Sequence, residues 1–214
     1  MARMLLRLFV FTAAIIMAAA CGGGGGEVTS DRYYLSSDIP ASAFDNTQVK
    51  VQLNEILNTG GIVLEQNDVN VYVAKNHRWA SNLSQQLSAI FYTKINGKSF
   101  SKDRTFNLYF SKFNGSIDGH AHIIMSVKVI DQSGQQLLVK DYVYDEPTEQ
   151  DGYAALVLTL KNGYNQVIDT FIADGEKAAA EMAAKEEAAA KAKEEERETK
   201  QRGRSSYGSQ TQSW

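Results

Sequence analysis

Apolar residues recur with two different spacings along the middle of the sequence. The order of these two patterns constrains the fold more than any other feature. Over residues 106–143, large apolar side chains recur at every second position, most regularly in the stretch 121–129. Over residues 153–172 they recur at spacings of three and four. A period of two is typical of strands with one buried face, and a period near 3.6 is typical of amphipathic helices. The sequence therefore predicts a sheet followed by a helix that packs on it.

The alternating segments predict six strands. Alternation indicates a strand over 49–54 and two short strands, 62–64 and 69–73, around a turn at Asn67-Asp68. Three longer strands follow, and hairpin turns at Asn114-Gly115, Asp118-Gly119 and Ser133-Gly134 make them an antiparallel meander. The apolar faces assigned to these three strands are Phe106, Leu108 and Phe110; Ala121, Ile123, Met125, Val127 and Val129; and Leu137, Val139 and Val143.

Two amphipathic helices complete the predicted domain. The first carries apolar residues at 83, 87, 90, 91 and 95, with Ser81 or Asn82 as its N-cap, and ends at Asn96-Gly97. The second begins after a cap at Asp151 and is expected to stop at Gly175. Both helices would bury their apolar faces on one side of the sheet. The expected fold class is therefore α+β, a mostly antiparallel sheet with two helices on one face, over residues 31–175.

The first twenty residues have the composition of an export signal. Arg3 and Arg7 precede an apolar run from Leu8 to Ala20, which is too short to span a bilayer as a helix. The small residues before Cys21 resemble the lipobox of bacterial lipoprotein signal peptides. That resemblance implies a diacylglyceryl group and an N-acyl chain on Cys21. The alternative is an ordinary signal peptide with an A-x-A cleavage site.

The residues after the cysteine suggest a tether. Segment 21–30 contains the run Gly22 to Gly26, which holds no structure by itself. Because Gly22 and not Asp follows Cys21, resemblance to the lipoprotein sorting rule implies the periplasmic face of the outer membrane. More than one acyl chain is needed for stable anchoring.

The C-terminal part reads as a charged helical extension. Residues 176–202 are nearly all Ala, Glu, Lys and Arg, which are strong helix formers. Without a seam of large apolar residues, a coiled coil is disfavoured. The helix is either a semi-rigid spacer or an arm that reaches a partner in the periplasm. Residues 203–214 are rich in Ser, Gln and Gly and are expected to be disordered.

Composition and motifs argue against catalysis and against nucleic-acid binding. The net charge is −3, which excludes a strong basic field, and one cysteine cannot form an internal disulfide. His120 and His122 share one face of a predicted strand near Asp118, but no further ligands are evident, so the expectation is a solvated face and no metal. No nucleophile with its base can be assembled, so we expect a non-enzyme without a cofactor.

Four segments in a fixed order carry a family resemblance: Tyr33-Tyr34-Leu35; Asn70-Val71-Tyr72-Val73-Ala74 followed by Arg78-Trp79-Ala80-Ser81-Asn82-Leu83; Phe113-Asn114-Gly115 with Asp118-Gly119; and Asp151-Gly152-Tyr153. Together they resemble the ABC-type transport auxiliary lipoprotein family, over about residues 30–173. The extension after Gly175 departs from the usual family pattern.

The resemblance implies a function. Family members are outer-membrane lipoproteins of Gram-negative bacteria that face the periplasm. They work with MCE-domain membrane proteins in systems, some of the paraquat-inducible type, that move lipid between the two membranes. The lipoprotein would dock the MCE conduit at the outer membrane, as a homo-oligomer. Two alternatives stay open: a lipoprotein that assists lipopolysaccharide or outer-membrane protein assembly, and an envelope-spacing structural lipoprotein.

Aromatic and turn residues within the resembling segments are the candidate partner interface, because interfaces favour large aromatic side chains. The candidates are Tyr72, Trp79, Tyr153, Asp118 and Gly119. For Trp79 the alternative is a core aromatic residue. For Asp118-Gly119 the alternative is a pair that only forms a turn.

Overall fold

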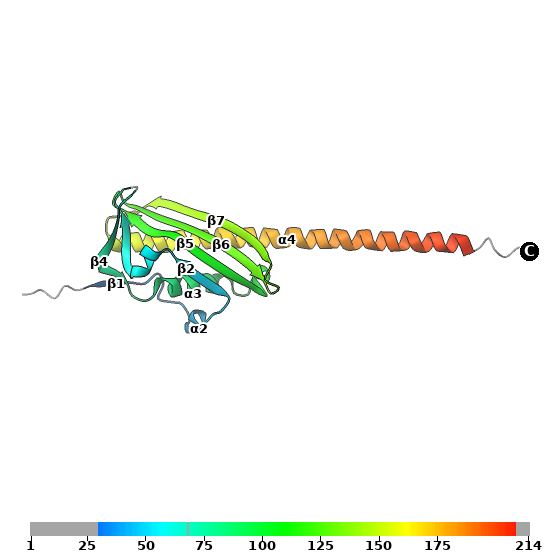
Figure 1. Cartoon of the computed structure of the whole chain (residues 1–214), viewed down its shortest axis with the longest axis horizontal. Coiled ribbons are helices and arrows are strands. Elements are labelled where there is room, and N and C mark those ends of the chain that lie inside the picture. Colours follow the sequence, from blue (N-terminus) through cyan, green and yellow to red (C-terminus); the bar gives the residue numbers. More distant parts are fainter. Residues whose placement is uncertain (1–29, 68, 209–214) are drawn as a thin grey trace, which may run out of the picture.

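The computed structural model describes residues 30–67 and 69–208 (Figure 1). Cys21, the tether glycines, Asp68 and residues 209–214 lie outside this range. The described strands and helices are β1 (Asp31–Tyr33), α2 (Ala41–Phe44), β2 (Val49–Leu53), β3 (Gly61–Glu65), β4 (Val71–Trp79), α3 (Leu83–Ile95), β5 (Arg104–Ser116), β6 (His120–Asp131), β7 (Gln136–Pro147) and α4 (Tyr153–Gly208), with short 3-10 helices at Glu55–Thr59 and Ser99–Ser101.

The sheet contains the predicted meander. Strands β5, β6 and β7 are adjacent and antiparallel, with Leu108 opposite Val127 and Val127 opposite Lys140. The order across the sheet is β1-β4-β3-β5-β6-β7. The meander is confirmed, and it forms one half of a larger mixed sheet. The predicted turn at Asn114-Gly115 is wrong, because both residues pair with β6 inside strand β5.

Three parallel pairings join the N-terminal strands to this sheet. Strand β2 runs beside the first half of β5, with Val51 opposite Leu108, and β3 pairs with the far end of the same strand, with Leu64 opposite Gly115. Strand β1 pairs in parallel with β4. Parallel partners are separated in sequence by other elements, so local alternation cannot reveal these pairings.

The β3–β4 pair is longer than its sequence pattern indicates. The predicted strand at 69–73 is observed as Val71–Trp79, antiparallel to β3. Gly61 permits the close approach, because a Cβ atom there would lie 2.6 Å from the carbonyl oxygen of Ala74. Only glycine lets the two backbones come this close.

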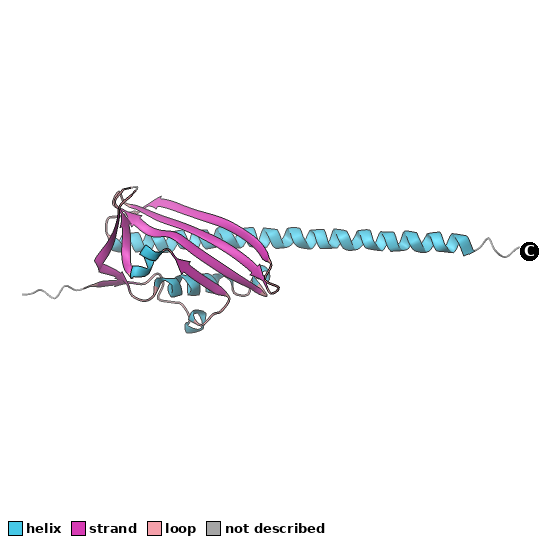
Figure 2. Cartoon of the chain, in the orientation of Figure 1, coloured by secondary structure: helices cyan, strands magenta, loops and turns pink. Residues whose placement is uncertain are grey.

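Both helices lie against the same face of the sheet (Figure 2). The ring of Phe106 on β5 packs on Phe91 of α3 and on Phe171 of α4, at centroid distances of 5.9 and 5.8 Å. The hydroxyl of buried Tyr164 on α4 donates a hydrogen bond to the Leu87 carbonyl on α3, at 2.9 Å. Helix α3 starts as predicted, since the Asn82 side chain accepts from the Gln85 N–H. The α+β fold class is confirmed.

The apolar face assigned to the last strand is wrong. Leu137, Val139 and Val143 are 40%, 55% and 67% exposed, and the inward positions of β7 are Leu138, Tyr142 and Tyr144. The β6–β7 register, which includes a bulge between Val129 and Ile130, places Val139 opposite Lys128 and Val143 opposite Ile124 on the outer face. Register decides which alternate side chains are buried, and here both sets are apolar enough to fit.

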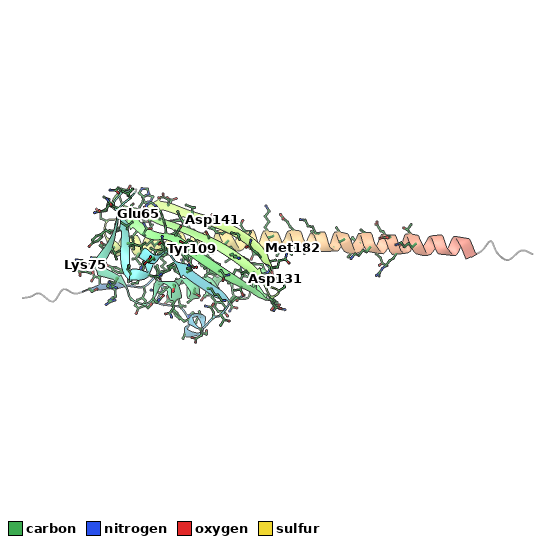
Figure 3. The ribbon with its side chains drawn as sticks, in the orientation of Figure 1. Glu65, Lys75, Tyr109, Asp131, Asp141 and Met182 are labelled. Atoms are coloured by element: carbon green, nitrogen blue, oxygen red, sulfur yellow. The ribbon has the colours of Figure 1, made fainter. Side chains whose placement is uncertain are left out.

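The predicted stop at Gly175 is also wrong, because α4 continues from Tyr153 to Gly208. The glycine has a packing role: a Cβ at this position would lie 2.9 Å from the Phe100 ring. Beyond it the helix is mostly exposed, and Met182 lies on this extension, past the end of the sheet (Figure 3). The helix also enters the segment 203–214, where the sequence predicts no structure.

Ion pairs one turn apart support the extension. Glu187 pairs with Lys191 at 2.7 Å, and Glu196 with Lys200 at 2.6 Å. Each such pair stabilises an exposed helix by about 0.2–0.5 kcal/mol. Across residues 30–67 and 69–208, no helix has both the length and the apolar character needed to cross a membrane.

Candidate partner interface

Several candidate residues meet at one end of the sheet, which we call the hairpin end and define by Tyr72, Ile117, Asp118, Gly119 and Tyr153. The β3–β4 and β5–β6 turns lie beside each other there because β3 pairs with the end of β5. The Thr148 N–H donates to the Gly119 carbonyl at 2.7 Å, which ties the β5–β6 turn to the connection before α4. Two hairpins and the start of a helix therefore build this surface.

A cavity of about 320 Å³ opens at the hairpin end. Its apolar lining comes from three elements and includes Leu64, Ile117, Tyr153 and Leu156, and its polar lining includes Gly119 and His120. A Cβ at Gly115 would collide with the side chains of Leu156 and Leu64. The start of α4 is therefore in close contact with the end of β5. The cavity is large enough for one or two side chains of a partner.

Tyr153 is held in place by an aromatic stack. Its ring lies on the His77 ring with a centroid distance of 3.9 Å and an angle of 15° between the planes. The other side of this cluster is polar, because His77 Nδ1 lies 3.0 Å from the Tyr33 hydroxyl and 3.3 Å from the Asp31 carboxylate. Partial burial raises the pKa of Tyr153, with a smaller contribution from Tyr72 nearby. Tyr153 is thus a fixed and partly buried part of the surface.

Tyr72 and the turn residues beside it are exposed. Tyr72 is 44% exposed and Val71 is 51% exposed on β4, and Ile117 is 65% exposed at the β5–β6 turn. Sequence reasoning missed Val71 and Ile117 as parts of this surface. A signal was available, because both are large β-branched residues that lie close to the predicted turns at 67–68 and 118–119. Exposed apolar side chains beside these turns make this end of the sheet a candidate interaction surface.

Asp118-Gly119 forms the turn between β5 and β6. Gly119 has φ +86°, and its N–H donates to the Ser116 carbonyl at 3.1 Å. The Ser116 hydroxyl donates to the Asp118 carboxylate, and this hydrogen bond lowers the pKa of Asp118. Asp118-Gly119 therefore forms a turn, and Gly119 also lines the cavity.

Trp79 does not join this surface. It lies at the other end of β4, is 4% exposed and packs against Phe113 at a centroid distance of 6.0 Å. Of the two alternatives for this side chain, the core aromatic residue is the one observed. Burial of the indole removes Trp79 from the set of residues that could contact a partner.

The two strand histidines lie on the outer face of the sheet, as their alternation predicts. Their Nδ1 atoms lie 2.9 Å (His120) and 3.3 Å (His122) from the same Asp145 oxygen. The hydrogen bond to Asp145 raises the pKa of His120, and the same bond lowers the pKa of Asp145. Sequence proximity pointed to Asp118, whereas the β6–β7 register brings Asp145 opposite His122. Among the described residues, no group of three or more His, Cys, Asp or Glu side chains is placed to hold a metal ion.

Curated relatives and solved structures resemble this chain. The intermembrane transport lipoproteins PqiC of Escherichia coli (strain K12) and of Shigella flexneri are each 29% identical over 127 residues, 55% of this chain and 67% of theirs. The crystal structure of an uncharacterized protein matches with a TM-score of 0.55 and 24% identity, over 68% of this chain and 98% of that one. Protein XCC0632 from Xanthomonas campestris matches with a TM-score of 0.56 and 14% identity, over 70% and 99%. These two structures share the fold.

The family comparison covers the folded domain. The profile of the ABC-type transport auxiliary lipoprotein component family matches residues 46–171, which run from just before β2 into the last core turns of α4. The match includes most of the hairpin end. More than half of the chain is covered, so the protein is a member of the ABC-type transport auxiliary lipoprotein family.

Proposed function

We propose that this protein is the outer-membrane lipoprotein of an MCE-type intermembrane lipid transport system, in which it docks the periplasmic end of the MCE conduit at the outer membrane. The observation that carries the proposal is the family match over residues 46–171, together with the likeness to lipoproteins named for intermembrane transport. In this role the protein is a docking component, without catalytic turnover.

The anchor in this proposal is Cys21. Lipid on its sulfur and its amino group would hold the chain at the periplasmic face of the outer membrane. From Cys21 to the start of β1 the chain spans ten residues, which reach about 35 Å at most when extended. The domain would thus stay close to the membrane yet be free to orient toward a partner.

The hairpin end is the proposed docking surface. Tyr153 is preorganised by its stack on His77, and Tyr72 is exposed beside it. The cavity between Ile117 and Leu156 would receive an apolar side chain of the MCE-domain protein. Fixed aromatic side chains lose little conformational entropy on binding, so they suit the centre of an interface. In keeping with the family resemblance, we expect the docked form to be a homo-oligomer.

The first test is a pull-down of the lipidated, full-length protein from solubilised membranes, with mass spectrometry of the captured proteins. The proposal requires an MCE-domain membrane protein among them. Recovery of a β-barrel alone would instead support a role in lipopolysaccharide or outer-membrane protein assembly. In that case the family match would describe the fold and not the task.

A matched pair of variants tests the surface. Tyr72→Ala is expected to weaken recovery of the MCE-domain protein by about tenfold, as truncation of a central aromatic residue does. Tyr109→Ala is the control, because Tyr109 has a similar exposure of 41% but lies on β5, away from the hairpin end (Figure 3). Equal recovery with both variants would show that docking uses another surface.

A further inference from the structure

A second hollow runs between the last strand and the exposed side of α4, and we call it the β7–α4 groove. Its volume is about 690 Å³. It follows the C-terminal half of β7, the connection to α4 and the first turns of that helix. Its lining includes Tyr144, Glu146, Glu149, Asp151, Ala155 and Leu158.

The strand beside the groove is an edge strand. Within the described part of the chain, β7 pairs with β6 and with no other strand. An edge strand presents unpaired backbone N–H and C=O groups, and proteins commonly protect such edges with lysine side chains. Here Lys140 points to Asp174 on α4, at 2.6 Å, and the hydroxyl of Tyr142 donates to the same carboxylate at 2.9 Å. These contacts tie the middle of β7 to α4, on the N-terminal side of the stretch of strand that lines the groove.

The floor of the groove is apolar and shallow. Ala154, Ala155 and Leu158 lie on one face of α4, and Leu158 is 54% exposed although it is a large apolar residue. The ring of Tyr144 forms the inner wall, where it packs directly on Gly163. An added strand would place every second side chain over this floor, and the two alanines leave room for those side chains.

The charged side chains that line the groove are all acidic. Its lining contains Glu146, Glu149 and Asp151, and no lysine or arginine. Glu146 lies near the end of β7, and Glu149 and Asp151 lie in the connection before α4; we call these three positions the rim. Charge complementarity therefore favours a strand that carries basic side chains.

We propose that the β7–α4 groove binds an extended, basic segment of a protein partner, which adds as a strand to the edge of β7. Backbone hydrogen bonds to β7 supply the register. Small apolar side chains of the segment fill the floor over Ala155 and Leu158, and its lysine or arginine side chains meet the carboxylates at the rim. This inference goes beyond the docking role proposed above, because it depends on the groove alone and not on the hairpin end.

The test uses the full-length protein in detergent and a fluorescent peptide of about eight residues that alternates lysine with valine. Fluorescence anisotropy is expected to show saturable binding. Ala155→Trp, which fills the groove, should weaken binding by about tenfold or more. Ala184→Trp is the matched control on the exposed extension of α4 and should bind like the wild type. Circular dichroism verifies that both variants are folded.

Two further comparisons separate strand addition from attraction by net charge. Glu146→Lys with Glu149→Lys should weaken binding, whereas the same charge change at Glu181 and Glu194 on the extension should not. A peptide N-methylated at alternate residues cannot complete the backbone ladder and should not bind. Equal loss with both charge-reversed proteins, or full binding of the methylated peptide, would overturn the proposal.

A second copy of this chain is the remaining candidate for what occupies the groove. Analytical ultracentrifugation of the wild type and of Ala155→Trp decides this point. If the wild type is an oligomer that Ala155→Trp dissociates, a second copy occupies the groove and the proposal of a separate partner is wrong. An oligomeric state that is the same in both proteins agrees with the proposal.

Discussion

Gly163 stands at the point where α4 passes closest to β7. A Cβ at this position would lie 2.5 Å from Cδ1 of the Tyr144 ring, and the glycine is buried. In an exposed helix, alanine would be preferred over glycine by about 1 kcal/mol. The absence of a side chain at Gly163 therefore allows α4 to pack closely on the Tyr144 ring of β7.

Gly163→Ala is expected to lower the free energy of unfolding by about 1–3 kcal/mol, because the added methyl group overlaps the Tyr144 ring. Urea denaturation followed by fluorescence measures the change. In a Tyr144→Ala background the same substitution should be neutral or stabilising, since only the helix preference of alanine remains. Stabilisation by Gly163→Ala in the wild type would contradict the observed contact.

His120 and Asp145 predict a pH dependence of stability. The folded pKa of His120 lies above 6.5, so its contribution is complete below pH 6.5 and is lost as the pH rises through the folded value. The folded pKa of Asp145 lies below 3.8, so the carboxylate contributes above pH 3.8 and its contribution is lost as the pH falls through the folded value. The pair therefore stabilises the fold most between these limits.

The measurement is the urea midpoint of the wild type and of His120→Gln, at about pH 5.5 and about pH 8.5. The wild type should exceed the variant by more at the lower pH. Asp145→Asn provides the control, because without this carboxylate the advantage of histidine over glutamine should change much less between the two pH values. A wild-type advantage that is independent of pH would show that His120 and Asp145 are not paired in solution.

At the scale of the element, α4 divides into a core part and an exposed part. Phe171 is buried, and Asp174 accepts hydrogen bonds from β7, whereas the residues beyond Ala179 are exposed wherever their side chains are described. Packing against the sheet stabilises the first part. Helix propensity and ion pairs one turn apart support the second.

Two truncations test this division. A chain that stops after Ala180 should keep the urea midpoint of the full-length protein. A chain that stops after Thr170 loses Phe171 and the Asp174 contacts and should be less stable by about 3–5 kcal/mol or fail to fold. A large loss on the shorter deletion, after Ala180, would mean that the extension packs against the domain in solution.

Sequence patterns identified elements whose stabilising contacts are local. Helix α3 follows from its apolar spacing and its cap at Asn82, and β6 follows from strict alternation over 121–129. The outward face of β7 could not be predicted, because Leu137, Val139 and Val143 alternate as regularly as the inward Leu138, Tyr142 and Tyr144. Only the register with β6 decides between the two faces.

The same limit applies to the candidate interface. Tyr72, Gly119 and Tyr153 come from a strand, a turn and a helix, and they are brought together by long-range contacts such as the parallel β3–β5 pairing and the stack of Tyr153 on His77. Trp79 lies on the same strand as Tyr72, yet it is buried. The continuation of α4 past Gly175 was missed because the glycine is there for its contact with Phe100 and not as a helix stop.

At the scale of the whole molecule, the domain has two distinct ends. Strand β1, the first described element, and the hairpin end lie on the left in Figure 1, whereas the extension of α4 leaves the domain on the right. In the proposed function, the extension would thus be carried on the side of the domain opposite its docking surface.

Deletion of residues 181–214 tests what the extension contributes in the cell. The docking role predicts only partial loss of function, measured as sensitivity to envelope stress, because the hairpin end is intact. A purely envelope-spacing role predicts complete loss. A replacement helix of equal length but different Ala, Glu and Lys order should restore the function if length alone matters, and should fail if the sequence contacts a partner.

The continuity of α4 has a mechanical consequence. The helix that closes the core continues without interruption into the rod that projects from it. From Ala179 to Gly208 it extends about 45 Å, so a tilt of about 10° where Gly175 meets Phe100 would move the far tip by about 8 Å. The helix acts as a lever: the part of α4 in the core is its short arm, and the exposed extension is its long arm. Whatever holds its tip sets the orientation of the sheet, and a rotation of the sheet is magnified at the tip.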